Sequence, residues 1–245
     1  MKIIQVKDYH EMSQRTADII IQKVKQAKRM NLGLATGGTP KGLYEQLIKD
    51  HQKNGTSYQH VTTFNLDEYI GLDKNDSNSY HYYMAKSLFN HIDVPKSQIH
   101  LPNGVTENHT KECKDYEQLI EDLGGIDLQV LGIGQNGHIG FNEPGTPFKS
   151  PTHIVTLEES TRQANARYFN TLEDVPTHAI TMGIASIMKS KEILLLVSGE
   201  KKAEAMQKLL NGEISEDFPA SVLKRHHHVT IVADQKALSG VLVSP

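Results

Sequence analysis

Short aliphatic runs alternate with longer amphipathic stretches along this chain of 245 residues, and this alternation restricts the fold more than any other feature. Most of the runs are unbroken apolar segments, as is typical of parallel strands that are buried on both faces of a sheet. The strands predicted in this way are residues 2–6, 32–35, 61–66, 128–133, 154–157, 179–182, 193–197 and 229–232.

Helical periodicity fills most of the intervals between these strands. The predicted helices are residues 11–28, 40–49, 78–89, 111–123, 201–210 and a short one at 220–224. This order predicts an α/β fold in which a doubly wound, mostly parallel sheet carries helices on both faces. We find no Pro-, Gly- or Ser-rich linker, so we expect a single domain over residues 1–245. The polar, helix-patterned stretch 158–177 interrupts the alternation, and we interpret it as a lid.

Composition excludes several classes of protein. The net charge of −3 leaves no positive field that would hold nucleic acid nonspecifically. A single cysteine, Cys113, excludes internal disulfides and a thiolate metal cage. The longest aliphatic run, residues 193–197, is far shorter than the roughly 20 residues of a membrane span, and the N-terminus lacks the apolar length of a signal peptide. We therefore expect a cytoplasmic protein with neither nucleic-acid nor membrane partners.

Ligands of open α/β sheets bind at the carboxyl ends of the strands, so we searched the segment after each strand. Residues 32–35 are followed by Thr36, Gly37, Gly38 and Thr39. Thr39 can cap the next helix and Pro40 can occupy its first position, which would leave free N–H groups at a positive helix end. The pattern is neither GxxxxGK[ST] nor GxGxxG. An anion site and an ordinary strand-to-helix turn are equally compatible with it.

Two adjacent acids, Asp67 and Glu68, follow residues 61–66. They fit a general base with a neighbouring carboxylate. They fit better, taken alone, a solvated turn with a helix cap.

The loop after residues 128–133 contains His138 and Glu143 among several glycines and one proline, which together forbid a regular helix. A histidine and a carboxylate in such a loop favour general acid/base catalysis. A metal site is the less favoured alternative, because a second histidine at helical spacing, a CxxC and an HExxH are all missing. A buried structural histidine is the other alternative.

Cationic side chains near two further segments suit an anionic ligand. Lys201 and Lys202 open the helix after residues 193–197, where a cation is unfavourable unless an anion lies beside it. Arg162 and Arg167 lie in the predicted lid. Surface roles remain the alternative for all four side chains.

Taken in order, the segments TGGTPKGLY, FNLDEY, LGIGQNGHIGFNEPG, NARYF and the Lys201-Lys202-Ala203 helix start resemble the glucosamine-6-phosphate deaminase family (the glucosamine/galactosamine-6-phosphate isomerases). The resemblance covers essentially the whole chain. It implies a modified Rossmann-like three-layer αβα sandwich. It also implies conversion of glucosamine 6-phosphate and water into fructose 6-phosphate and ammonium, in amino-sugar catabolism, with no cofactor and no metal.

The resemblance also assigns residue roles. It places the proton-abstracting carboxylate on Asp67 and the ring-opening group on Asn136, His138 and Glu143. The phosphate-binding residues that it implies are Thr36, Gly37, Gly38, Thr39, Arg167 and Lys202. A 6-phosphogluconolactonase-like hydrolase and a non-catalytic sugar-phosphate sensor remain the alternative functions.

The sequence departs from the family pattern in two ways. Some members carry Asp where this chain has Asn136, so we expect a lower basicity of His138 here. The longer, hexameric members are activated by N-acetylglucosamine 6-phosphate through basic residues shortly after the FNEP segment. Those positions fall near Pro151, His153 and Val155 in this chain. We therefore expect little activation, and a monomer or a small homo-oligomer.

Overall fold

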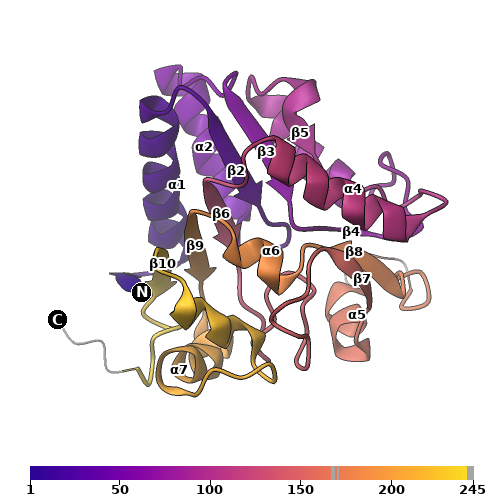
Figure 1. Cartoon of the computed structure of the whole chain (residues 1–245). Helices are drawn as coiled ribbons and strands as arrows, with labels where there is room; N and C mark the ends of the chain where they lie inside the picture. Colours follow the sequence, from indigo (N-terminus) through magenta and orange to yellow (C-terminus); the bar gives the residue numbers. More distant parts are fainter. Residues whose placement is uncertain (167–168, 170, 242–245) are drawn as a thin grey trace.

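A computed structural model of the chain describes residues 1–166, 169 and 171–241 (Figure 1). Its main sheet contains seven strands, every one parallel to its neighbours, in the order β1-β10-β9-β6-β2-β3-β5. The strands are β1 (Lys2–Val6), β2 (Met30–Leu34), β3 (Val61–Asn65), β5 (Ile99–His100), β6 (Leu128–Leu131), β9 (Glu192–Val197) and β10 (Val229–Asp234). The expected α/β class and mostly parallel sheet are confirmed.

Helices cover both faces of this sheet. One face packs against α1 (Tyr9–Gln26), α2 (Lys41–Asn54) and α3 (Tyr80–Ser87). The opposite face packs against α4 (His109–Asp122), α6 (Ile184–Met188), α7 (Ala203–Asn211) and the 3₁₀ segment η5 (Pro219–Arg225). Two separate apolar clusters therefore flank the sheet, which is the αβα layering that the sequence predicted. The six predicted helices correspond to α1, α2, α3, α4, α7 and η5, with ends that differ by at most five residues, whereas α6 was not predicted.

Strand order also fixes where a ligand can enter. The chain runs outward from β2 to β3 and β5, returns to β6 on the other side of β2, and then continues to β9 and β10. The direction of winding thus changes between β2 and β6. In open α/β sheets the crevice at the carboxyl ends of such a strand pair is the usual ligand site.

Two of the predicted strands do not belong to the parallel sheet. A second, antiparallel sheet has the order β4-β8-β7 and consists of β4 (Asp67–Tyr69), β8 (His178–Thr181) and β7 (His153–Thr156). The expectation that residues 154–157 and 179–182 continue the main sheet is wrong. Along β7 half-buried and exposed residues alternate, because one face of this small sheet meets solvent.

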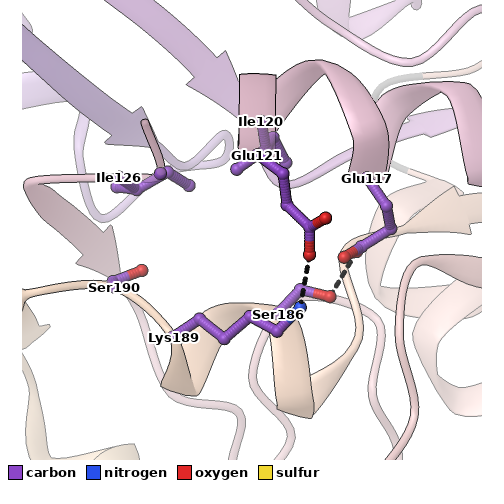
Figure 2. Close-up of a pocket in the computed structure, with 8 residues that line it drawn as sticks. Glu117, Ile120, Glu121, Ile126, Ser186, Lys189 and Ser190 are labelled. Atoms are coloured by element: carbon purple, nitrogen blue, oxygen red, sulfur yellow. Dashed lines mark hydrogen bonds and ion pairs between the residues drawn. The ribbon is translucent and has the colours of Figure 1, made fainter. Parts of the chain in front are cut away.

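The start of β7 is anchored to α4. The Glu117 carboxylate accepts a 2.9 Å hydrogen bond from the backbone N–H of Thr152 and another from its hydroxyl. Figure 2 shows Glu117 facing Ser186 of α6, whose hydroxyl also donates to it, and Lys189 reaching Glu121 at 2.9 Å. The half-buried carboxylate of Glu117 thus connects α4 and α6 with the strand that precedes the 158–177 segment.

Among the described residues of that segment, α5 covers Glu159–Asn165. Arg162 donates to the backbone carbonyls of Leu172 and Val175, so the described part of the segment folds back on itself. Within the described part of the chain, no helix has both the length and the apolar character needed to cross a bilayer.

Candidate active site

Asp67 begins β4 at the point where the chain leaves the main sheet. The N–H of Leu66 donates to Leu34 of β2, and Leu66 in turn accepts from Met182. Asp67 is therefore held at the carboxyl end of β3, paired in register with Thr181. Its side chain is buried, so the expectation of a solvated turn at this position is wrong.

Burial and a neighbouring anion change the acidity of Asp67. The loss of hydration, and then the charge of Glu68, raise the pKa of Asp67 from 3.8 to about 8. A carboxylic acid with such a pKa exchanges its proton near neutral pH, which suits a general base or acid.

The glycine-rich loop after β6 packs directly against this carboxylate. Gly140 adopts a φ of 58°, and a Cβ atom built on it would lie 3.6 Å from Oδ2 of Asp67. The N–H of Phe141 donates to Oγ1 of Thr181 at 3.1 Å, and Nδ2 of Asn142 donates to the carbonyl of Met182. Because these bonds fix the loop on β8, Asp67 and the loop form one site.

His138 depends on a second glycine of the loop. The N–H of Gly134 donates to the carbonyl of His138 at 2.9 Å, which closes a tight turn. A Cβ atom on Gly134 would lie 2.4 Å from Nδ1 of the imidazole. Since real Cβ atoms do not approach other atoms so closely, glycine is required here to make room for the ring.

Three polar side chains surround Glu143. Its Oε2 atom lies 3.4 Å from Nδ1 of His138 and accepts a 2.6 Å hydrogen bond from Nδ2 of Asn136. Its Oε1 atom accepts a 2.6 Å hydrogen bond from the hydroxyl of Thr161 in α5. Burial acts to raise the pKa of Glu143, but His138, Thr161 and Asn136 outweigh it and hold the pKa below its usual value.

The two carboxyl groups of the site are thus adjusted in opposite directions. Asp67 binds a proton more tightly than an ordinary aspartate, and Glu143 stays ionised beside the imidazole. Carboxyl groups whose environments separate their pKa values are typical of paired acid/base roles.

The Thr36–Thr39 turn follows β2, the strand that neighbours β6 where the direction of winding changes. Tyrosine hydroxyls hold its carbonyl groups: Tyr83 of α3 donates to Gly37 at 2.6 Å, and Tyr9 of α1 donates to Gly38 at 3.0 Å. Gly37 adopts a φ of 97°, which side-chain-bearing residues rarely take.

The backbone N–H groups of the same turn differ from its carbonyl groups, which accept hydrogen bonds from tyrosines. Among the described residues, no protein acceptor receives the N–H groups of Gly37, Gly38 or Thr39. Thr39 does not cap the helix as expected, because α2 begins at Lys41 with Pro40 as its N-cap and no side-chain cap. The unused amides before a helix make the turn suitable for an anion.

Lys202 reaches the crevice from the loop after β9. Its ammonium donates to the carbonyl of Ile133 at 2.7 Å, immediately before the glycine-rich loop. Burial lowers the pKa of Lys202, which means that its charge lacks solvation and gains from an anionic partner. Lys201 is exposed, so the structure separates the two lysines.

The sequence suggested two arginines of the 158–177 segment, Arg162 and Arg167, as ligands of an anion. Arg162 is engaged by the carbonyls of its own segment. Arg167 lies outside the described residues.

Sequence reasoning missed several residues of the site. Thr161 carries no signal, because its contact with Glu143 joins positions 18 residues apart. Tyr83 falls inside a predicted helix and Tyr9 just before one, and neither position belongs to a recognised binding motif. As for metals, the described residues contain no group of three or more His, Cys, Asp or Glu side chains arranged to hold an ion.

Comparison with known proteins shows the family to which the chain is similar. Residues 7–232 match the family model described as glucosamine-6-phosphate isomerases/6-phosphogluconolactonase. A glucosamine-6-phosphate deaminase of Halalkalibacterium halodurans is 62% identical, covering 100% of this chain and 99% of the relative. Glucosamine-6-phosphate deaminase 1 of Bacillus subtilis is 56% identical over 98% of this chain and 99% of the relative.

Solved structures show the same fold. A structure described as a monomeric glucosamine-6-phosphate deaminase superposes with a TM-score of 0.96 at 56% identity, covering 98% of this chain and 99% of the other. A 6-phosphogluconolactonase of Trypanosoma brucei gives a TM-score of 0.82 at 17% identity, covering 98% of both chains. At that identity the second likeness concerns the fold alone.

Proposed function

Because the chain belongs to the glucosamine-6-phosphate isomerase/6-phosphogluconolactonase family, we propose that it is a glucosamine-6-phosphate deaminase. The reaction converts glucosamine 6-phosphate and water into fructose 6-phosphate and ammonium. The observation that carries the proposal is the buried carboxyl of Asp67, whose pKa of about 8 suits proton transfer at carbon, beside the His138–Glu143 pair.

The substrate itself supplies the electron sink that this chemistry needs. Once the sugar ring opens, the C1 aldehyde accepts the electron pair left when a base removes the hydrogen from C2. Return of a proton to C1 moves the carbonyl character to C2, where the amine then sits on an imine-like carbon. Water adds to that carbon and ammonium leaves. The overall reaction involves no net oxidation or reduction, so it requires no redox cofactor.

Asp67 is the group that we assign to the carbon acid. A general base works best when its pKa lies near the working pH, and positioned acid/base groups contribute roughly 10²–10⁴-fold each. Burial keeps this carboxyl weakly acidic, and the close packing of Gly140 places it against the loop that carries His138.

His138 is the group that we assign to ring opening. Its Nδ1 atom faces Glu143, which leaves Nε2, the other ring nitrogen, to move a proton between the ring oxygen and the anomeric hydroxyl. Glu143 supports a positive imidazolium by charge. Asn136 contributes an amide to the same carboxylate and positions it.

The phosphate belongs, in this proposal, at the other side of the crevice. The unused amides of Gly37, Gly38 and Thr39, the hydroxyl of Thr36 and the poorly solvated ammonium of Lys202 favour a dianion there. Arg167 joins this group through the family resemblance. Anchoring the phosphate supplies positioning, because it is remote from the bonds that change.

We also propose the larger-scale arrangement. Residues 1–245 form one domain in which the 158–177 segment acts as a lid, supported by the hydrogen bond from Thr161 of α5 to Glu143. The monomeric relative favours a monomer, which light scattering after size-exclusion chromatography would test. A phosphorylated sugar does not cross membranes unaided, which favours the cytoplasm.

Two assays distinguish the activities of the family. Purified protein is given glucosamine 6-phosphate, with ammonium and fructose 6-phosphate as readouts, and separately 6-phosphogluconolactone, with loss of the lactone as readout. We expect the first reaction and at most a trace of the second. Lactone hydrolysis without ammonium release would overturn the proposal, and binding without either turnover would support a sugar-phosphate sensor.

A further inference from the structure

Glu68, the neighbour of Asp67, is a buried carboxylate whose hydrogen-bonding capacity is filled by N–H groups. Oε1 accepts from the backbone N–H of Tyr69 at 2.8 Å and of Tyr80 at 2.9 Å. Oε2 accepts from the backbone N–H of His81 at 2.9 Å and from its Nδ1 at 2.8 Å. The side chain is only 1% exposed. Four N–H donors thus fix the position of this carboxyl group.

Three of these donors belong to Tyr80 and His81 in the first turn of α3, which starts after the N-cap Ser79. Glu68 therefore neutralises the positive end of α3 from the side of β4. The same helix carries Tyr83, which donates to the carbonyl of Gly37. Glu68 thus fixes, through α3, one of the groups that shape the phosphate-binding turn.

Glu68 and Asp67 are successive residues of β4, so their side chains point to opposite faces of that strand. They do not share a proton or a hydrogen bond, and their interaction is through charge. Among the described residues, Tyr44 of α2, Tyr80 of α3 and Tyr116 of α4 also interact electrically with Asp67. Burial raises the pKa of each of these three phenols, so they are neutral at working pH. Glu68 is therefore the charged neighbour.

His81 is the part of this arrangement that solvent can reach. Its ring is partly exposed and borders a surface cleft that Asp73, Lys74 and Asn103 also line. A positive charge at position 81 would offset the charge of Glu68 from outside the active site, while a neutral side chain would not.

We propose that Glu68 is a positioning residue for the proton transfer at C2. Its fixed, buried negative charge keeps Asp67 a stronger base than an ordinary aspartate, and its hydrogen bonds with α3 hold the Thr36–Thr39 turn in place. The inference rests on the proposed function for its chemical meaning. Without a second anion nearby, Asp67 would lose its proton more readily and return it to carbon less well.

The test measures the protonation of Asp67 directly and without substrate. Protein labelled with ¹³C at the aspartate carboxyl is titrated by NMR, and the Asp67 signal is assigned by its absence from Asp67→Asn. We expect a midpoint near pH 8 in the natural sequence. Glu68→Gln removes the charge but keeps a similar shape, and the midpoint is expected to fall by about one pH unit or more.

Variants of His81 separate charge from structure, since they leave Glu68 in place. His81→Lys brings a permanent cation to Glu68 and is expected to lower the Asp67 midpoint. His81→Asn removes the ring without adding charge and is expected not to lower it. His91→Asn, at an exposed histidine beyond the end of α3, serves as the control and leaves the midpoint unchanged.

The outcomes are decisive in either direction. If the titration midpoint of Asp67 is unchanged in both Glu68→Gln and His81→Lys, the proposal is overturned. This holds even if both variants lose activity, because such losses would then reflect structure alone. If Glu68→Gln does not fold, the His81→Lys and His81→Asn pair still decides. Failure of the natural protein to release ammonium would overturn the proposed function, while the titration would still test the electrostatic role of Glu68.

Discussion

Nδ1 of His138 faces Oε2 of Glu143 across 3.4 Å, and that same oxygen accepts a 2.6 Å hydrogen bond from Asn136. One carboxylate oxygen therefore serves both an imidazole and an amide. Because only the imidazole can become charged, the carboxylate responds to protonation of His138 and is otherwise held in place by Asn136. This arrangement lies on one loop, next to a second carboxyl group, that of Asp67. The pKa of Asp67 is raised, whereas the pKa of Glu143 is lowered.

Replacement of Asp67 by asparagine is expected to abolish proton transfer at C2 while phosphate binding remains. The amide keeps the size of the side chain but cannot accept the proton, so turnover is expected to fall by roughly 10²-fold or more. Exchange of deuterium from C2-labelled glucosamine 6-phosphate into water, and binding by calorimetry, measure the two effects. Unchanged exchange in this variant would eliminate Asp67 as the base.

Stability of the same variant is expected to depend on pH. The pKa of Asp67 is about 8 in the folded protein against about 3.9 unfolded. Between these values the folded state holds more protons than the unfolded state, so this group's contribution to stability is full below about pH 4 and declines as pH rises to about 8. The Asp67→Asn variant lacks this titrating group, so its stability is expected not to show this decline with pH.

Urea unfolding of both proteins at pH 5, 7 and 9 tests this linkage. The free energy of unfolding of Asp67→Asn, relative to the natural sequence, is expected to increase by at least about 1 kcal/mol from pH 5 to pH 9. A difference that does not vary with pH would contradict a raised pKa of Asp67.

Replacement of Glu143 by glutamine is expected to impair ring opening more than the carbon chemistry. Glutamine retains an oxygen for the Thr161 hydroxyl but cannot stabilise a charged His138, so turnover of the cyclic substrate is expected to fall roughly 10–10²-fold. An analogue that lacks both the 4- and the 5-hydroxyl can close neither a furanose nor a pyranose ring. With this analogue the loss is expected to shrink, and an equal loss for both substrates would place Glu143 in a later step.

Replacement of Gly134 by alanine is expected to displace His138. The added methyl group would lie 2.4 Å from Nδ1, so the ring or the loop has to move, and turnover is expected to fall at least about 10-fold. Gly132→Ala is the matched control, because a Cβ atom there meets nothing within 4 Å. Equal turnover by the two variants would show that activity does not depend on the space that Gly134 leaves for the imidazole of His138.

Activation by N-acetylglucosamine 6-phosphate is expected to be slight, with hyperbolic kinetics throughout. Thr152 is already bound by Glu117, and Nδ1 of His153 is occupied by the carbonyl of Pro151. The segment therefore offers little free polar capacity for an effector. Initial rates with and without the acetylated sugar phosphate measure this, and a sigmoidal curve that the effector converts to a hyperbola would show the expectation to be wrong.

Local sequence determined much of this protein. Short, largely apolar runs identified six of the seven parallel strands, because burial on both faces of a sheet favours apolar side chains along most of a strand. Glycines and Pro144 in the loop after β6 were enough to indicate an irregular, shaped segment with His138 and Glu143 in it. Residue identity also favoured acid/base catalysis over a metal site in this loop.

Only the tertiary structure decided how these pieces meet. It moved residues 153–156 and 178–181 into a separate antiparallel sheet with β4, since a short apolar run does not state which strand will pair with it. It buried Asp67, which raises a pKa that no sequence pattern reports, and it brought Thr161 to Glu143 and Tyr83 to Gly37. Periodicity records which face of an element is apolar, whereas desolvation and hydrogen bonding depend on what that face finally packs against.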